Sequence, residues 1–167
     1  MSWAFGRQTP DNNLMRFVAK RFHTPVTMLD IGSGEGANAR ELRFRGHHVV
    51  TVDKDPAVEC NHPCDIRNFE PEDRFELIYD INTLCHVEDP PFNEIRRWLK
   101  PRGVFYSVCP SDFTSRVEVA MGKAFTRFLT EYEARGLYSR YFHVTFGDTH
   151  YQLPSSEFYH SWIIEAR

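Results

Sequence analysis

Three glycines alternate with other residues directly after an apolar run that predicts a buried strand: Gly32, Gly34 and Gly36. Glycine at such a point lets the backbone turn sharply and lets a ligand approach without a Cβ in the way. The helix expected next would present free amide groups to a polar or anionic group. Asp53, 23 residues after Asp30, ends the following predicted strand, where its carboxylate can accept hydrogen bonds from both hydroxyls of a ribose. Together these residues predict a site for a nucleoside-containing cofactor.

The same turn also fits the dinucleotide-binding fingerprint, because Ala37 follows Gly32 and Gly34 at the required spacing. Two features favour a different cofactor. Asp30 stands two residues before the first glycine, where a carboxylate suits a cationic ligand better than a pyrophosphate. The chain, at 167 residues, is also too short to add a dehydrogenase substrate domain. A nicotinamide-binding domain stays open as an alternative, which predicts binding of a dinucleotide.

Composition and charge narrow the function classes further. The length of 167 residues predicts a single domain over 1–167, and 41% hydrophobic with 26% charged residues is typical of globular proteins. A net charge of −3 disfavours broad electrostatic binding to nucleic acid or to an anionic membrane. No apolar run approaches the roughly 20 residues that span a bilayer, and the first residues lack a secretory pattern. We therefore expect a cytoplasmic protein that does not bind membranes.

The cysteines predict neither a disulfide framework nor a metal site. Cys60, His62 and Cys64 could be three metal ligands, but no matching second half follows, and zinc usually takes four ligands. Cys85 and Cys109 are isolated. We expect four reduced thiols and no metal.

Apolar runs alternate with segments of helical periodicity along most of the chain. Asp11 predicts the cap of a first helix, and Gly46 predicts the left-handed end of a second. The most periodic segment, from Val117 to Tyr132, predicts a helix with a core-facing stripe. The remaining elements are strands expected at residues 26–29, 48–52, 75–79, 104–108, about 141–146 and about 158–165, and helices at 37–45 and 91–100.

This alternation predicts an α/β fold, a three-layer Rossmann-like sandwich with a mostly parallel sheet. The last two strands follow each other without a helix, so we expect an antiparallel strand near one edge. In such sheets ligands bind beyond the carboxyl ends of the strands, next to the first one.

Four blocks in this order, VTMLDIGSGEG, GHHVVTVDKDP, FELIYDINTLCHVEDPP and WLKPRGVFYSV, resemble the class I S-adenosylmethionine-dependent methyltransferases. The resemblance covers about residues 14 to 110. Two departures stand out. Arg102 replaces one glycine of the usual Pro-Gly-Gly turn, and Lys54 follows the ribose acid where the family often has an apolar side chain.

The resemblance implies S-adenosylmethionine as the cofactor and gives the strand ends their roles. For Asp65, a turn or helix cap is an alternative to binding the adenine. Lys54 would cover the adenine with its aliphatic stem. The implied cofactor residues are Asp30, Gly32, Ser33 and Gly34 at the methionine end, Asp53 at the ribose, Lys54, Asp65 and Ile66 at the adenine, and Asp80 and Asn82 along the methionine part.

Methyl transfer from a sulfonium requires alignment of the reactants, exclusion of water and sometimes removal of a proton. His86, four residues after Asn82, is the candidate base, since an imidazole can accept a proton near neutral pH. A histidine that caps the loop before Glu88 is the alternative. Asp112 and the segment Gly147–Tyr151, expected as a loop, are second candidates for contacts with the acceptor.

We expect an enzyme that methylates an oxygen or nitrogen of a small-molecule acceptor. A nucleic-acid or protein methyltransferase is an alternative if a protein partner supplies the recognition surface. The Asn-Pro-Pro-aromatic tetrapeptide of base-amino methylation is missing directly after the strand expected at residues 75–79. Residues 89–92 echo it, but they lie too far past the end of that strand. A non-catalytic module that binds S-adenosylmethionine is a further alternative.

Overall fold

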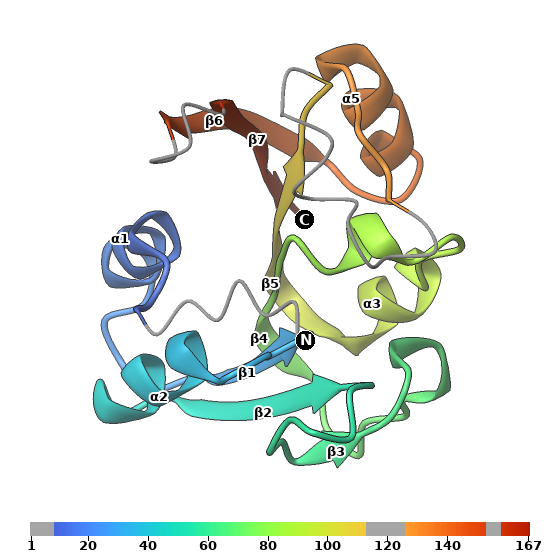
Figure 1. The fold of residues 1–167 in the computed structure, drawn as a ribbon. Coiled ribbons are helices and arrows are strands. Elements are labelled where there is room, and N and C mark those ends of the chain that lie inside the picture. Colours follow the sequence, from blue (N-terminus) through green and yellow to red (C-terminus); the bar gives the residue numbers. More distant parts are fainter. Residues whose placement is uncertain (1–8, 113–125, 153–157) are drawn as a thin grey trace.

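The computed structural model describes residues 9–112, 126–152 and 158–167 of the chain (Figure 1). The helices are α1 (Asn12–Arg21), α2 (Ala37–Phe44), α3 (Phe92–Trp98) and α5 (Glu131–Ser139), with short 3-10 helices η1 (Ile66–Asn68) and η2 (Leu84–His86). The strands are β1 (Thr27–Ile31), β2 (His48–Asp53), β3 (His62–Pro63), β4 (Phe75–Ile81), β5 (Leu99–Pro110), β6 (Val144–Gln152) and β7 (Phe158–Ala166).

The described strands form one sheet in the order β3-β2-β1-β4-β5-β7-β6. β1 lies between β2 and β4 and is parallel to both, and β4 is parallel to β5. β7 is antiparallel to β5 on one side and to β6 on the other. The prediction of a mostly parallel α/β sheet with an antiparallel strand near one edge is therefore confirmed.

Helices cover both faces of this sheet, which gives the molecule three layers (Figure 1). One core lies between the sheet and helices α1 and α2, and contains Met28, Leu77 and Tyr79. The other core lies under α3 and α5. It contains Leu29 and Ile31, which alternate along β1 with Met28 of the first core. Because successive side chains of a strand point to opposite faces, Asp30 lies on the α1 and α2 side of the sheet.

The local signals for the N-terminal half are confirmed. The Asp11 carboxylate accepts hydrogen bonds from the amides of Asn13 and Leu14, at 3.0 and 2.9 Å, and so caps α1. Gly46 ends α2 with a φ of 93°. β1 and β4 run two residues further than expected, so that Asp30 and Asp80 lie within strands rather than after them.

The predicted helix from Val117 to Tyr132 is wrong over residues 126–130, and residues 113–125 lie outside the described chain. Residues 126–128 are not helical, and Leu129 forms a bridge with Ser111. α5 begins only after Thr130, whose side chain and backbone exchange hydrogen bonds with Glu133 in a capping box. Tyr132 is 84% exposed and does not belong to a core stripe.

The end of α3 and the C-terminal strands also differ from expectation. α3 stops at Trp98, and Leu99 already belongs to β5, where it pairs with Phe75. The residues expected as a loop, Gly147–Tyr151, belong to β6 and pair with β7. None of the described helices is long and apolar enough to cross a membrane.

Candidate active site

The glycine turn after β1 has a backbone that requires glycine. Gly32 has a φ of +70°, and a Cβ added there would overlap the Thr83 side chain. Its amide donates to the Val52 carbonyl at 2.8 Å, which holds the turn against β2. Gly34 and Gly36 also have positive φ angles, 51° and 75°. The turn therefore passes close to the loop after β4, and only glycine fits at its first position.

Asp53 at the end of β2 fixes the far side of the same turn. Its Oδ2 accepts a hydrogen bond from the Gly34 amide at 2.9 Å, and its Oδ1 accepts one from the Asp55 amide at 2.9 Å. The side chain is half-buried. Because each carboxylate oxygen can accept more than one hydrogen bond, Asp53 can still receive two hydroxyl groups. The sequence predicted the position of Asp53 but missed its bond to Gly34.

Asp30 is a buried carboxylate that lacks a full set of partners. It is 2% exposed, and its Oδ2 completes no hydrogen bond with a described residue. Burial raises the pKa of Asp30 to about 7, the nearby Tyr79 hydroxyl opposes this rise, and the charges of Asp80 and Asp53 add to it. Such a group gains most from a ligand that brings a donor or a positive charge.

Two further oxygens share this lack of a partner. Ser33 Oγ, within the glycine turn, and Asn82 Oδ1, after β4, are both buried without a hydrogen bond to any described residue. Asn82 has a φ of 57°, a region that asparagine tolerates, and its amide donates to the Val108 carbonyl at 2.8 Å. The turn and the loop after β4 thus offer acceptors that the described residues leave unused.

Asp80 lies on the opposite face of the sheet from Asp30, and both oxygens of its carboxylate accept hydrogen bonds from the protein. Oδ1 accepts from the amides of Thr83 and Leu84 at 2.8 and 2.9 Å, and Oδ2 accepts from Ser107 Oγ at 2.8 Å. Burial raises its pKa to about 6, and these hydrogen bonds lower it. Asp80 therefore holds the loop after β4 in place, and its contact with a cofactor stays a prediction.

The residues predicted at the adenine lie around η1. Asp65 caps η1 and forms a two-pronged ion pair with Arg67, at 2.9 Å to Nε and 2.7 Å to Nη2. The hydrogen bonds from the Arg67 side chain lower the pKa of Asp65 to about 2. Ile66 is buried in the core, and Lys54 is exposed. The helix-cap alternative for Asp65 is observed, whereas adenine binding stays a prediction.

His86 ends η2 at the mouth of this region and is half-buried. Its Nδ1 lies 3.0 Å from Thr126 Oγ1, and its amide donates to the Thr83 carbonyl at 2.9 Å. The Arg127 amide donates to the Cys85 carbonyl at 2.7 Å. Residues 126–129, expected as helix, therefore run alongside η2. The role of His86 as a base stays a prediction.

Beyond the end of β5 the structure assembles residues that the sequence did not connect. Asp112 Oδ1 is buried without a partner among the described residues. Ser111, just before it, is bonded to His160 on β7, which also contacts Asp148 on β6. The sequence drew attention to Asp112 and Asp148 but not to Ser111 or His160, because no local spacing links strands so far apart along the chain.

The cysteine segment has other contacts than metal ligation. His62 packs edge-on against Phe69, with 5.1 Å between ring centroids. Cys60 and Cys64 are half-buried free thiols. Within the described residues, no group of three or more His, Cys, Asp or Glu side chains is arranged to hold a metal ion.

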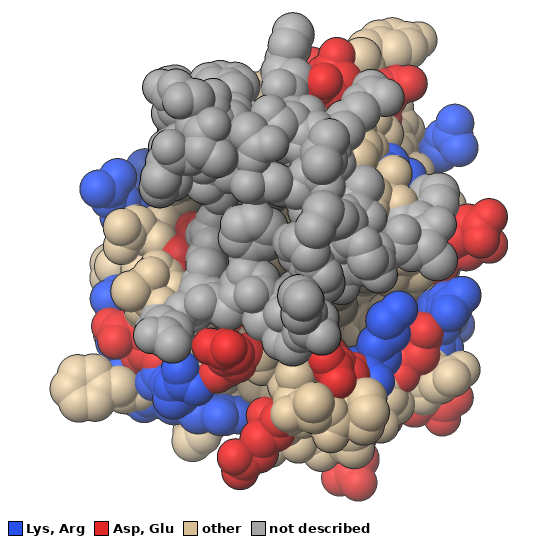
Figure 2. All heavy atoms as spheres, in the orientation of Figure 1, with Lys and Arg blue, Asp and Glu red and all other residues tan. Residues whose placement is uncertain are grey.

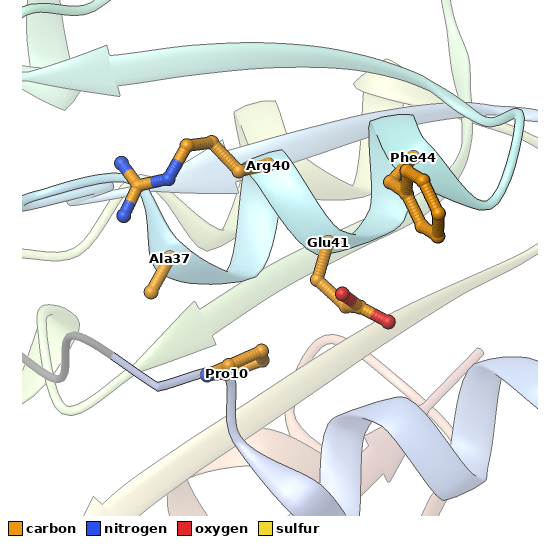
Figure 3. Close-up of a pocket in the computed structure, with 5 residues that line it drawn as sticks. All are labelled: Pro10, Ala37, Arg40, Glu41 and Phe44. Atoms are coloured by element: carbon orange, nitrogen blue, oxygen red, sulfur yellow. The ribbon is translucent and has the colours of Figure 1, made fainter.

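A separate surface pocket lies between α2 and the residue that leads into α1. It is lined by Pro10, Ala37, Arg40, Glu41 and Phe44, whose side chains surround it in Figure 3. Phe44 is 88% exposed. None of the predicted site residues lines this pocket, which belongs to the helical layer and not to the strand ends.

The comparisons with known proteins agree with this geometry. A family model described as a methyltransferase domain matches residues 2–166. A search of curated proteins finds no match. Among solved structures, the Burkholderia thailandensis 1,6-didemethyltoxoflavin-N1-methyltransferase, bound to 1,6-didemethyltoxoflavin and S-adenosylhomocysteine, is similar with a TM-score of 0.70 and 19% identity, over 93% of this chain and 77% of that chain.

Two archaeal structures are similar as well. A SAM-dependent methyltransferase from Methanosarcina mazei has a TM-score of 0.67 and 17% identity, over 90% of this chain and 95% of that chain. A chain from the complex with the Haloferax volcanii Trm112 methyltransferase activator has a TM-score of 0.68 and 16% identity, over 91% of this chain and 87% of that chain. At these identities the likeness is one of fold.

Proposed function

The chain belongs to the family of methyltransferase domains whose model it matches, and from that premise we propose that it transfers a methyl group from S-adenosylmethionine to an oxygen or nitrogen of a small-molecule acceptor. The solved structure with bound S-adenosylhomocysteine supports this choice of cofactor. A cytoplasmic location and a single catalytic domain are part of the proposal.

The observation that supports it most is the set of acceptors around the glycine turn that the described residues leave unused. Asp53 is bonded to the Gly34 amide, and its oxygens can still accept hydrogen bonds from the ribose hydroxyls. Asp30 Oδ2, Ser33 Oγ and Asn82 Oδ1 are buried without described partners, and they suit the charged methionine end. These residues fit S-adenosylmethionine, which when bound supplies an activated methyl group.

The protein itself then has to bind the cofactor and the acceptor, orient them toward each other and keep water out of the site. The Thr83 hydroxyl donates to the Gly32 carbonyl at 3.4 Å, which links the turn to the loop after β4. Asp80 locks that loop through two amide hydrogen bonds. His86 is the candidate that removes a proton from the acceptor, and its bond to Thr126 orients its ring.

The charge distribution supports a small acceptor. Lys and Arg alternate with Asp and Glu over the described part of the face in Figure 2, and no continuous basic surface is seen there. Together with the net charge of −3, this disfavours a nucleic-acid duplex as the substrate.

A subunit of a larger methyltransferase is the second candidate. The similar Haloferax volcanii chain was solved in a complex with a methyltransferase activator, which supports a role for a protein partner here. A related alternative is a non-catalytic module, which would bind S-adenosylmethionine without transferring the methyl group itself. Substitution of His86 would leave such a module's function unchanged, whereas substitution of Asp53 would affect both candidates.

Calorimetric titration with S-adenosylmethionine, S-adenosylhomocysteine and NAD tests the proposal. The wild-type protein should bind the first two in the micromolar range, and Asp53→Ala should weaken both by at least about tenfold, the cost of roughly one charge-assisted hydrogen bond. Asp53→Asn keeps an acceptor for the Gly34 amide, so its affinities should lie between those of the wild-type protein and those of Asp53→Ala. Asp73→Ala is the matched control, because Asp73 is an exposed acid just before β4. Binding of NAD alone would contradict the proposal.

A further inference from the structure

A hydrogen-bonded series of buried side chains connects α5 with the loop after β4. The Tyr138 hydroxyl on α5 lies 2.8 Å from Ser107 Oγ on β5, and Ser107 Oγ donates to Asp80 Oδ2 on β4 at 2.8 Å. The Asp80 carboxylate also accepts the amides of Thr83 and Leu84, at 2.8 and 2.9 Å. Asp80 and Ser107 are partners in the register of β4 and β5. Elements far apart along the chain are thus joined at one carboxylate.

The direction of the series follows from the charge of Asp80. An ionised carboxylate can only accept hydrogen bonds, and a serine hydroxyl has a single proton to donate. Ser107 therefore gives its proton to Asp80, which leaves Ser107 Oγ as the acceptor for the Tyr138 hydroxyl. Because both hydroxyls donate toward the carboxylate, the series stabilises its charged form.

Packing fixes the Tyr138 hydroxyl at this position. Tyr138 is 3% exposed, and its ring contacts Phe92 of α3 and Phe105 of β5, with 5.0 and 6.1 Å between ring centroids. Ser107 and Asp80 are completely buried. A buried polar group that loses its partner is costly, so each member of the series depends on the next.

The loop that Asp80 holds carries candidate residues of the proposed active site. Asn82, whose buried Oδ1 has no partner among the described residues, directly precedes Thr83. The His86 amide donates to the Thr83 carbonyl at 2.9 Å, and the Thr83 hydroxyl donates to the Gly32 carbonyl at 3.4 Å. Hydrogen bonds to an ionised group are roughly twice as strong as neutral ones. The loop is therefore held most firmly while Asp80 is charged.

The surroundings of Asp80 contain other ionisable groups. Burial raises the pKa of Asp80 to about 6, while its hydrogen bonds lower it. Burial also raises the pKa values of both neighbouring thiols and of the Tyr138 hydroxyl, so these groups stay neutral near pH 7. Among the described residues, the groups that face Asp80 are Cys85 on η2, Cys109 on β5, Tyr138 on α5 and Asp30 on the other face of the sheet, and Arg127 lies near the two thiols.

We propose that Tyr138 and Ser107 are positioning residues that keep Asp80 charged, an inference that rests on the proposed function. The charged carboxylate holds the loop after β4 so that Asn82 faces the cofactor and His86 faces the acceptor. Neither Tyr138 nor Ser107 touches the reactants. Loss of either hydroxyl raises the pH at which Asp80 takes up a proton, so cofactor affinity falls at low pH and recovers at higher pH.

The first measurement needs neither cofactor nor acceptor. The carboxyl-carbon chemical shift of Asp80, followed against pH in the chain labelled with 13C-aspartate, gives the midpoint of its titration. Ser107→Ala should raise this midpoint by about one pH unit or more, the effect of one charge-assisted hydrogen bond. Tyr138→Phe should raise it by a smaller amount, because Ser107 still donates to Asp80. A midpoint that neither substitution moves would overturn the proposal.

Each variant has a matched control in the same kind of element. Ser161→Ala removes the hydroxyl of a completely buried strand serine, whose Oγ has no partner among the described residues. Tyr132→Phe removes a hydroxyl from α5 at a residue that is 84% exposed. Both controls should leave the Asp80 midpoint and the cofactor affinity at their wild-type values.

The second measurement is calorimetric titration with S-adenosylhomocysteine at about pH 6.5 and about pH 8.5. Ser107→Ala should bind about five- to tenfold more weakly than the wild-type protein at the lower pH. At the higher pH the difference should shrink to less than about twofold, because Asp80 is then ionised in both proteins. Since both proteins are compared at the same pH, the titration of Asp30 affects them equally. Tyr138→Phe should show the same pattern at smaller size, and it keeps the test available if Ser107→Ala does not fold.

A purely structural role for the series predicts a different result. The substitutions would then lower the free energy of unfolding without changing affinity, or weaken binding equally at both pH values, and either result would overturn the proposal. A wild-type protein that binds neither S-adenosylmethionine nor S-adenosylhomocysteine would instead contradict the proposed function. The Asp80 titration would still decide whether Ser107 and Tyr138 keep that carboxylate charged.

Discussion

The strand ends around the glycine turn and the region around β5, β6 and β7 differ in how the chain brings their residues together. At the turn, Gly34 and Asp53 are bonded across 19 positions of the chain. Around β5, the bond between His86 and Thr126 spans 40 positions and that between Ser111 and His160 spans 49. The first region is built by two adjacent strand–turn units, whereas the second depends on the order of strands across the whole sheet.

The two regions also differ in what they leave unsatisfied. Around the turn, buried oxygens of Asp30, Ser33 and Asn82 have no described partner. Around β5, Ser111 is bonded to His160, which is bonded to Asp148, and only the neighbouring oxygens of Asp112 and Ser161 lack a described partner. The turn thus leaves the buried carboxylate oxygen of Asp30 without a described partner, whereas the region around β5 carries a preassembled polar series.

The largest effect that would test this contrast comes from Gly32→Ala. A Cβ there overlaps Thr83 and the φ of +70° strains any other residue. We expect a loss of roughly 2–5 kcal/mol in the free energy of unfolding, from overpacking and strain together. Cofactor affinity, measured by calorimetry on the folded fraction, should fall sharply.

Gly136→Ala is the matched control for that variant. Gly136 lies within α5, and a Cβ there would meet nothing within 4 Å. Alanine should stabilise the helix by about 0.5–1 kcal/mol in chemical denaturation, without a change in cofactor affinity. Equal losses in both variants would mean that the turn has no special geometry.

A smaller effect is expected from Asp30→Asn. The pKa of Asp30 is raised to about 7 by burial, so the folded state holds this proton more tightly than the unfolded chain does. The free energy of unfolding of the wild-type protein should therefore fall, by a few kcal/mol at most, as the pH rises from about 4 to about 7. Asp30→Asn should reduce this dependence, leaving the part due to Asp80, whose pKa is also raised by burial. It should raise stability above pH 7 and weaken cofactor binding.

Denaturation curves at several pH values measure the free energy of unfolding of Asp30→Asn, and calorimetry measures its affinity for the cofactor. Asp73→Asn is the control, since Asp73 is exposed and remote from the turn. If Asp30→Asn lowered stability at high pH and left affinity intact, Asp30 would serve the fold and not the ligand.

The sequence predicted the local structure around the glycine turn better than that of the region around β5 for a physical reason. Glycines that need positive φ angles, the capping Asp11 and the acid at the end of β2 all act on near neighbours, so their spacing is visible in the chain. Residues 126–129 were expected to be helical because of their apolar periodicity, but the Thr130 capping box starts α5 later. Tertiary contacts with Cys85 and Pro110 hold these residues instead.

Contacts between residues far apart along the chain also determine the partners of individual candidate site residues. The resemblance implies that Asp65 and Asp80 bind the cofactor. In the structure, Arg67 is bonded to the Asp65 carboxylate and the amides of Thr83 and Leu84 to the Asp80 carboxylate. Partners of this kind depend on side-chain positions that no motif specifies. His160 had no signal at all, since only the pairing of β5 with β7 brings it to Ser111.

The most direct test of the central claim is to map where S-adenosylhomocysteine binds by amide chemical-shift changes in the 15N-labelled chain. Binding at the strand ends predicts the largest changes at residues 32–34, at Asp53 and at residues 81–83. The amides around Pro10 and Phe44, beside the surface pocket in Figure 3, should change little. Changes concentrated at that pocket, with none at the glycine turn, would contradict the account.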